Sequence, residues 1–260
     1  MSTIEKALGL LDYFSEDTPE IGLSDFKTLT KYDKGTTHRY LSALRECGFL
    51  EQNPSTKAYR LGPAIIRLAA VREKTVPLRD SAKGVVLELA QELEELVHTS
   101  LPQAKGMSLL FKADGGHGGT RVGLDESDIL PFHAPSSGIA MLAFGDPEFR
   151  RKTLASARPQ FTKETSVSEE ALEGMIAEAQ LNGFASVHKT YEDEVSSVAM
   201  PFFDQTGHAI GTIAVATPSS RMTPEMKSRI IGLLSQASMT LSANIGGRIP
   251  QSFRNALIAA

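Results

Sequence analysis

The sequence predicts an α+β protein built from two domains. Three short segments with helical spacing of apolar residues fill about the first 48 residues, and a hairpin pattern follows them. After residue 78, strand patterns alternate with longer amphipathic helices, which is typical of one sheet with helices packed against it. The 260 residues, 41% of them hydrophobic, suit two domains with separate cores. We therefore expect domains at residues 1–62 and 78–260, joined by a linker helix at residues 63–77.

Charge and cysteine content limit the classes of function. The formal net charge is −4, so contacts with nucleic acid must come from locally placed basic groups. The single cysteine, Cys47, excludes an internal disulfide framework, and its place on the apolar side of a helical pattern favours a small core residue. No apolar run has the length of a membrane span, and the first residues lack a secretion signal. We expect a cytoplasmic protein with no membrane partner.

The first two helices are expected close to the start of the chain. Ser2 or Thr3 can form a capping box with Glu5, and apolar residues continue at helical spacing as far as Phe14. Ser24 is expected to cap the second helix. A tight turn separates this helix from the third, which is the arrangement of a helix-turn-helix.

The third helix, expected from Asp33 to Gly48, is the main candidate for contact with DNA. Asp33 can cap its first turn, and Gly48 can end it in a left-handed turn. One face is apolar through Thr37 and Leu41, whereas the opposite face carries short polar groups and Arg39. Such a slim polar face suits the major groove, where a guanidinium can bind guanine. An ordinary amphipathic surface helix has the same pattern, so the flanking segments must decide.

A hairpin directly after the third helix favours DNA binding. Residues 49–53 and 58–61 are predicted strands, and the turn between them carries Lys57. A hairpin in this position is a wing, whose polar tip can contact phosphates; a purely structural hairpin is the alternative. Residues 1–62 hold eight Lys or Arg against nine Asp or Glu, which implies few phosphate contacts and therefore binding as a dimer. The residues expected to contact DNA are Lys34, Thr36, Thr37, His38, Arg39, Ser42 and Lys57.

The second domain is expected to begin with a long helix at residues 78–96. Helices are predicted at 136–144, 147–155, 168–182 and 224–245, and strands at 99–104, 107–113, 120–124, 185–189, 197–203 and 209–216. The glycine-rich stretch 115–119 fits neither a dinucleotide-binding fingerprint nor a P-loop, and we expect a flexible loop there.

The order and spacing of several short blocks resemble the IclR family of bacterial transcription regulators over nearly the whole chain. These blocks include TTHRYLSAL at 36–44, YRLG at 59–62, LPFHA at 130–134 and AMPFFD at 199–204. The resemblance implies a winged helix-turn-helix domain, a linker helix and a GAF-like effector-binding domain. It also implies a homodimer or homotetramer that binds a pseudo-palindromic operator in double-stranded DNA under the control of a small-molecule effector.

The resemblance further implies a position for the effector. Its candidate contacts are Phe132, His133, Ser136, Ser137, Val187, Ser197, Ala214 and Ala216. Relatives that bind small oxyacids tend to have polar groups at the positions aligned with Val187, Ala214 and Ala216, and these are apolar here. Because a buried carboxylate needs several hydrogen-bond donors, we expect an effector with apolar or aromatic character. A pocket that has lost its ligand, or a shifted alignment between residues 185 and 197, is the alternative.

Enzymatic chemistry receives little support from the sequence. Ser24 and Lys27 fit a Ser-x-x-Lys pattern, but the further motif of such enzymes is missing. The six histidines are scattered, so no metal or other cofactor is expected. The acidic residues 192–194 suit a solvated loop better than paired catalytic acids. A small-molecule enzyme built on the second domain, and a winged helix that binds protein instead of DNA, remain as alternative functions.

Overall fold

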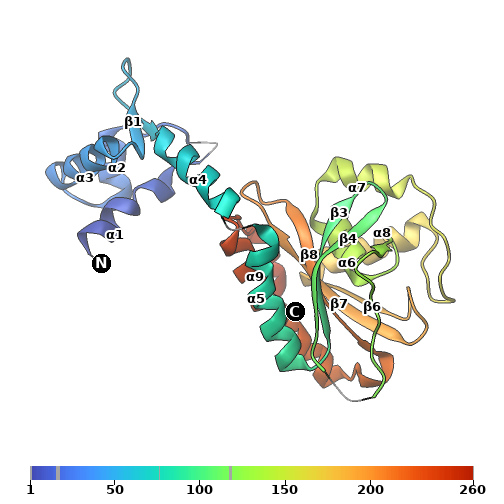
Figure 1. Cartoon of the computed structure of the whole chain (residues 1–260). Coiled ribbons are helices and arrows are strands. Elements are labelled where there is room, and N and C mark those ends of the chain that lie inside the picture. The colour runs from blue at the N-terminus through green and yellow to red at the C-terminus, as the bar shows by residue number, and fades with distance from the viewer. Residues whose placement is uncertain (1, 16–17, 76, 117–118, 260) are drawn as a thin grey trace. The chain divides into compact units, whose positions relative to one another are not determined.

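The computed structural model describes all residues except 1, 16, 17, 76, 117, 118 and 260. The chain forms two compact units, Met1–Pro77 and Leu78–Ala260 (Figure 1). Two residues of the glycine-rich stretch, 117 and 118, lie outside the described residues. The described helices include none that is long and apolar enough to cross a membrane. The α+β class predicted from the sequence is confirmed: helices and a hairpin in the first unit, and a sheet with helices in the second.

The first unit starts in the expected capping box. In helix α1 (Thr3–Leu8), Ser2 Oγ accepts from the Glu5 N–H at 3.2 Å, and the Glu5 carboxylate accepts from the Ser2 N–H at 2.8 Å. The helix ends sooner than predicted, and the 3-10 turn η1 (Leu11–Tyr13) follows it. Gly9 lies at the break, where its low helix propensity favours an end, and the adjacent Leu10 is fully buried.

The cap of helix α2 (Leu23–Thr30) lies two residues before the predicted one. Gly22 is the residue at its start, and the Asp25 carboxylate accepts from the Gly22 N–H at 3.2 Å. The predicted role of Ser24 as the cap is therefore wrong, since Ser24 already lies inside the helix. The helix ends at Lys31, whose φ of 60° turns the chain toward α3 (Lys34–Glu46).

The wing consists of β1 (Leu50–Gln52) and β2 (Tyr59–Leu61), which pair antiparallel. Ile21 adds a bridge, because its N–H and carbonyl exchange hydrogen bonds of 2.9 and 2.8 Å with Tyr59. The core beneath the helices and the wing contains Leu10, Ile21, Phe26, Tyr40, Leu41, Leu44, Leu50 and Tyr59. Helix α4 (Pro63–Thr75) completes this unit.

The second unit is organised around a six-stranded sheet in which every neighbouring pair is antiparallel. The strands lie in the order β5-β4-β3-β8-β7-β6, so the long strands β4, β3, β8 and β7 occupy the middle and the short strands β5 and β6 form the edges. Their bounds are β3 Leu96–Gln103, β4 Gly106–Asp114, β5 Ile129–Leu130, β6 Ala185–His188, β7 Val195–Phe203 and β8 Ala209–Pro218.

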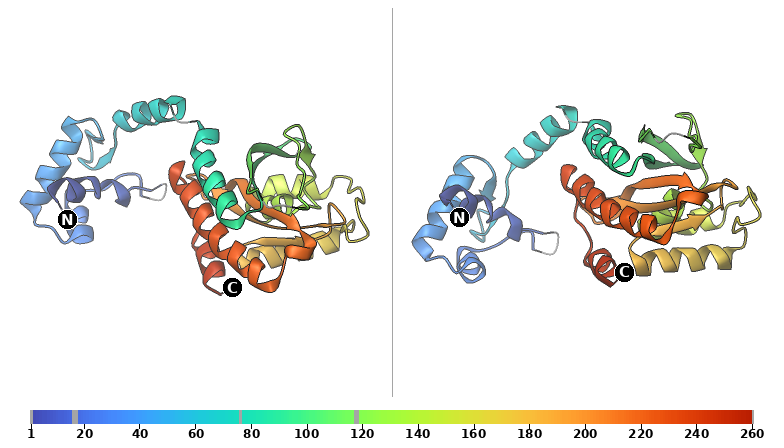
Figure 2. Two further views of the ribbon diagram at one scale, coloured as in Figure 1. Left: turned by 60° about the horizontal axis from the view of Figure 1, so that its bottom comes forward. Right: turned by 90° about the horizontal axis from the view of Figure 1, so that it is seen from below.

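Helices cover both faces of this sheet. Helices α5 (Leu78–Leu93) and α9 (Pro224–Asn244) lie side by side on one face, as Figures 1 and 2 show. Helices α6 (Ser136–Phe144) and α8 (Glu169–Asn182) cover the other face and are joined by a segment that contains α7 (Pro147–Leu154). The final helix, α10 (Gln251–Ala259), packs on α8.

Two predicted elements of the second unit differ from the structure, and one further helix was not predicted. The helix expected to reach residue 96 ends at Leu93, because Glu94 takes a left-handed φ of 56° and the chain enters β3 directly. Residues 120–124 form no strand, and β5 at Ile129–Leu130 pairs with β4 instead. Helix α10 was not predicted. Two side chains from other segments hold residues 120–124 through backbone carbonyls. Lys112 Nζ donates to the Leu124 carbonyl, and Arg221 Nη1 donates to the Thr120 carbonyl at 2.9 Å.

Candidate functional site

Helix α3 is anchored at its start by Asp33. The Asp33 carboxylate accepts from the Thr36 N–H at 2.9 Å, and hydrogen bonding to Thr36 lowers the pKa of Asp33 below its usual value. This cap satisfies one of the free N–H groups of the first turn. The expected cap at Asp33 is thus present, and it fixes the end of α3 from which a major-groove helix contacts bases.

The exposed face of α3 carries most of the residues expected to contact DNA. Lys34, His38 and Arg39 are exposed, whereas Thr36 and Ser42 are half-buried. The Arg39 guanidinium lies 5.6 Å from the centre of the Tyr40 ring. Short side chains around one arginine give this face the profile that a groove requires.

Thr37 is a correction to the predicted contact residues. Its side chain is fully buried, and its hydroxyl donates to the Asp33 carbonyl at 2.9 Å. Thr37 lies on the face that packs into the core with Leu41, so it cannot reach a base edge. Cys47 is a second correction: it was expected in the core, but it is exposed, because it follows the last helical residue at the C-cap.

The tip of the wing presents Lys57. This residue has a φ of 60° and is exposed, and its N–H donates to the Asn53 carbonyl at 2.9 Å. Gln52 Nε2 donates to the Lys57 carbonyl at 2.7 Å, so the backbone of the tip is well held. Arg60, by contrast, is paired with Glu51 at 2.6 Å and with Glu20 at 3.5 Å. Lys57 is therefore better placed than Arg60 to bind a phosphate.

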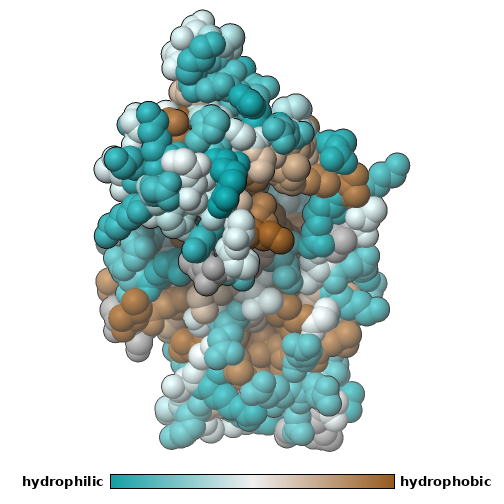
Figure 3. All heavy atoms as spheres, turned by 90° about the vertical axis from the view of Figure 1, so that its left-hand side faces the viewer, coloured by the Kyte–Doolittle hydropathy of each residue, from teal (hydrophilic) through white to brown (hydrophobic). Residues whose placement is uncertain are grey.

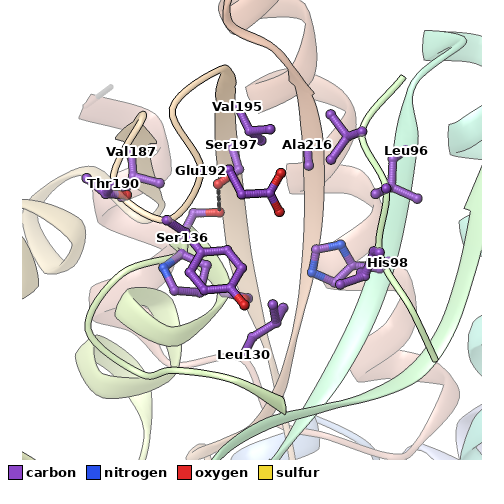
Figure 4. Close-up of a pocket in the computed structure, with 16 residues that line it drawn as sticks. Leu96, His98, Leu130, Ser136, Val187, Thr190, Glu192, Val195, Ser197 and Ala216 are labelled. Carbon is purple, nitrogen blue, oxygen red and sulfur yellow. Dashed lines mark hydrogen bonds between the residues drawn. The ribbon is translucent and has the colours of Figure 1, made fainter. Parts of the chain in front are cut away.

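The second unit contains a pocket between the sheet and the start of α6. Its cavity volume is about 40 Å³, and Figure 4 shows side chains from β3, β7 and β8 around it. The covering segment, residues 120–124, contributes Val122, Gly123 and Leu124 to the wall. The remaining wall residues are Leu96, His98, Leu130, Pro135, Ser136, Ser137, Val187, Thr190, Tyr191, Glu192, Val195, Ser197 and Ala216.

The pocket brings together five of the eight predicted effector contacts. These are Ser136, Ser137, Val187, Ser197 and Ala216. Ala214 is not among the lining residues: it faces the same side of the sheet but is fully buried between its strand neighbours His98 and Ala199.

Phe132 and His133 line a second, separate cavity of about 300 Å³, together with residues of α7 and of the segment that follows it. His133 Nε2 lies 2.9 Å from the Pro159 carbonyl, and burial followed by the nearby Arg158 charge lowers the pKa of His133. The loop that carries both residues packs closely on the start of α6, since a Cβ at Gly138 would lie 2.4 Å from the Phe132 carbonyl oxygen. Phe132 and His133 therefore shape this loop from behind and do not face the pocket.

Hydroxyl groups at the start of α6 meet the sheet. Ser136 Oγ donates to Ser197 Oγ at 2.8 Å, which Figure 4 draws as a dashed line. Ser137 Oγ is buried and has no hydrogen-bond partner among the described residues. Because a buried hydroxyl is normally paired, Ser137 is a candidate contact for a ligand.

His98 is the main residue that the sequence analysis missed. It projects from β3 into the pocket (Figure 4), is fully enclosed, and neither ring nitrogen has a partner among the described residues. Burial lowers the pKa of His98 to about 4, so the ring is neutral near pH 7 and offers one donor and one acceptor. An isolated histidine at a strand position gives no motif, and only its alternation with Leu96 places it on this face.

Glu192 was expected in a solvated acidic loop, and it does lie in an exposed loop. Its carboxylate nevertheless lines the pocket, between Ser197 and Ala216 in Figure 4. Burial raises the pKa of Glu192, and the neighbouring Asp128 raises it further. Tyr191, the residue before it, has its pKa raised by burial and by the same two carboxylates.

An ion pair secures the edge of the pocket. Arg221 binds both oxygens of Glu95 at 2.5 and 2.6 Å, and Glu95 is 3% exposed. The same guanidinium holds the Thr120 carbonyl, so it ties the covering segment to the beginning of β3. The groups around this pocket suit non-covalent binding of a small molecule, and the described residues contain no cluster of three His, Cys, Asp or Glu that could hold a metal.

Two family models cover most of the chain. The IclR helix-turn-helix domain matches residues 3–54, and the C-terminal domain of the bacterial transcriptional regulator IclR matches residues 72–243. The chain belongs to the IclR family. Members of this family are transcriptional regulators that pair a DNA-binding helix-turn-helix domain with an effector-binding domain, and they are not enzymes. The IclR-type regulator predicted from the sequence is thus confirmed.

Several relatives match over nearly their full length. The HTH-type transcriptional regulator XynR of Escherichia coli K12 is 27% identical over 95% of this chain and 98% of its own length. The glycerol operon regulatory protein of Streptomyces coelicolor is 24% identical over 95% and 97%. The crystal structure of an IclR transcriptional regulator from Silicibacter sp. TM1040 is 39% identical, covers 97% of this chain and 99% of that one, and superposes with a TM-score of 0.90.

Proposed function

We propose that this IclR-type regulator recognises its operator through α3. His38 and Arg39 contact base edges, Thr36 and Ser42 lie beside them, and Lys34 and Lys57 bind phosphates. The observation that carries this assignment is the division of α3 into a buried face and an exposed face with one arginine. An arginine that binds both acceptors of guanine contributes about 1–3 kcal/mol of discrimination against other bases.

We infer that the regulator acts as a homodimer or homotetramer on a pseudo-palindromic operator in the cytoplasm. One wing and one α3 supply few cationic contacts, so two copies are needed for high affinity. Helix α4 offers apolar surface for such a contact, with Ile66 and Val71 exposed by 74% and 52%. The face drawn in Figure 3 is mainly hydrophilic, and hydrophobic patches interrupt it.

The pocket beside Ser136 and Ser197 is the proposed effector site. Most of its lining is apolar, and a few hydroxyl groups and His98 provide directional contacts. This composition supports an effector with apolar or aromatic character. Ligand binding is expected to shift operator affinity through the linker formed by α4 and the start of α5, with a coupling of about 1–3 kcal/mol.

Fluorescence anisotropy with the DNA upstream of its own gene tests the proposal. We expect tight binding that resists scrambled competitor DNA and weakens steeply as the salt concentration rises, because bound phosphates release counterions. Binding no tighter than to scrambled DNA, both there and with operators selected from random sequence, would contradict recognition through α3.

A further inference from the structure

The lining of the pocket carries a negative charge and no lysine or arginine among the described residues. Glu192 is the only charged side chain among the sixteen residues of the described structure that line it, and it is negative. Lysine and arginine side chains on adjoining segments do not line the pocket: Lys189 pairs with Glu194, Arg221 pairs with Glu95, and Lys112 donates to the carbonyl of the wall residue Leu124. A carboxylate ligand would therefore meet no lysine or arginine among the described residues that line the pocket.

The mouth and the inner end of the pocket differ in chemistry. At the mouth, the Glu192 carboxylate is partly exposed, and Asp128 lies close enough to raise the pKa of Glu192 and of Tyr191. At the inner end, His98 is 5% exposed and Ser137 is fully buried, and their polar atoms have no partners among the described residues. The walls between these ends are apolar, through side chains such as Leu96, Val195 and Ala216.

We propose that this pocket binds a small primary amine. The ammonium group lies at the mouth against Glu192, the apolar body fills the middle, and a hydrogen-bonding group at the far end contacts His98 and Ser137. The inference rests on the proposed role of this pocket as the effector site and adds the chemical class of the ligand. An ammonium supplies three donors and a positive charge, which match the carboxylate at the mouth.

The neutral state of His98 is consistent with this arrangement. A neutral imidazole at the inner end cannot balance a carboxylate, but it can both donate to and accept from a hydroxyl group. Ser197 accepts a hydrogen bond from Ser136 and so retains its own proton for a ligand. The inner end is therefore suited to an uncharged polar group, such as a phenol or an alcohol.

A matched set of ligands tests the charge preference. The probes are 4-hydroxybenzylamine, 4-hydroxybenzyl alcohol and 4-hydroxybenzoate, with n-butylamine, n-butanol and butyrate as a smaller set. Isothermal titration calorimetry with the full-length protein should give an amine affinity at least about tenfold higher than that of the matched carboxylate.

Substitutions of two loop carboxylates make the test specific. Glu192→Gln should lower the amine affinity about tenfold and leave the affinity of the alcohol within about twofold. Asp193→Asn is the control, because Asp193 belongs to the same loop, is exposed, and does not line the pocket. Both positions are at the surface, so both variants should fold as the wild type does.

The outcomes separate this inference from the proposed function. Three results would each overturn the amine assignment. The carboxylates bind more tightly than the amines, the amine affinity is unchanged in Glu192→Gln, or no amine binds. An amine that binds with the expected dependence on Glu192 but leaves operator affinity unchanged would instead contradict the proposed effector response.

Discussion

At the residue scale, Thr37 shows how one helix can mix structural and functional positions. It lies between residues 36 and 38 on the sequence, yet its hydroxyl is buried against the Asp33 carbonyl, and its neighbours on the same turn face outward. Its role is to hold the first turn of α3. The alternation of buried and exposed residues along α3 therefore decides which residues can meet DNA.

Thr37→Val is expected to weaken the fold without altering base preference. The valine keeps the shape of the side chain but removes the hydroxyl donor, so the free energy of unfolding should fall by about 1 kcal/mol. Urea denaturation measures the loss, and competition between operator variants measures base preference. A changed base preference would show that Thr37 contacts DNA directly.

His98 predicts an acid sensitivity of the folded state. Burial holds its pKa at about 4, below the usual value of 6.5, so protonation favours the unfolded chain. Above pH 6.5 the neutral ring costs the folded state nothing. As the pH falls from 6.5 toward 4, the free energy of unfolding should decrease by about 3 kcal/mol on account of His98.

Urea denaturation of the wild type and of His98→Leu between pH 7.5 and pH 4 checks this prediction. The wild type should lose more stability over that range than the variant, since carboxylates and the other histidines titrate in both proteins. Equal losses in the two proteins would mean that His98 is not held neutral by burial.

Residue types and spacing allowed part of the site to be predicted. The helical period correctly assigned Thr37 and Leu41 to the buried face of α3, because that face repeats regularly. Cys47 was misplaced because the helical period no longer holds at a C-cap. His98 was missed because burial of a single strand residue depends on which helix covers it, and α6 is distant in the sequence.

At the element scale, the Arg221–Glu95 pair joins three segments that are far apart in the sequence. It connects the turn after β8 with the beginning of β3, and through Thr120 it also holds the covering segment. Because Glu95 is almost fully buried, removal of its partner leaves an uncompensated carboxylate in the protein interior.

Arg221→Ala should lower the free energy of unfolding by about 3 kcal/mol or more. Arg229→Ala is the matched control: Arg229 also faces a glutamate, Glu92, but both side chains are 53% exposed, so the loss should stay within about 1 kcal/mol. Thermal and urea denaturation compare the two variants. Similar losses in both would contradict the structural role of the buried pair.

Regular elements were easier to predict than the segments between them. The strands β4, β7 and β8 and the helices α6, α8 and α9 lie close to their expected ranges, because their apolar patterns are long and consistent. Residues 120–124 have an alternating pattern but form no strand, since the backbone contacts from Lys112 and Arg221 hold them across the pocket. Tertiary contacts of this kind produce no pattern in the local sequence.

At the scale of the whole molecule, the family assignment followed from the order of short blocks along the chain. The pocket itself did not follow from them: its walls come from β3, β7, β8, the start of α6 and two loops. The apolar positions Val187 and Ala216 were expected there, but the acidic mouth at Glu192 appears only when the loop after β6 folds back over the sheet.

The assembled state should be larger than one chain. Size-exclusion chromatography with light scattering is expected to give two or four times the chain mass of 28.1 kDa. Ile66→Ser on the exposed surface of α4 should shift this distribution toward smaller species if that helix lies in the contact. A monomer at micromolar concentration that still binds DNA tightly would contradict the proposed assembly.

Selection of binding sites from random DNA is the most direct test of the central claim that α3 reads the operator. The wild type and Arg39→Ala are compared, with Arg254→Ala in α10 as a control that removes the same charge from the other unit. We expect Arg39→Ala to lose its preference for guanine at one position in each half-site, and Arg254→Ala to select the wild-type sequence. An Arg39→Ala variant that selects the same operator with the same affinity would contradict recognition through α3.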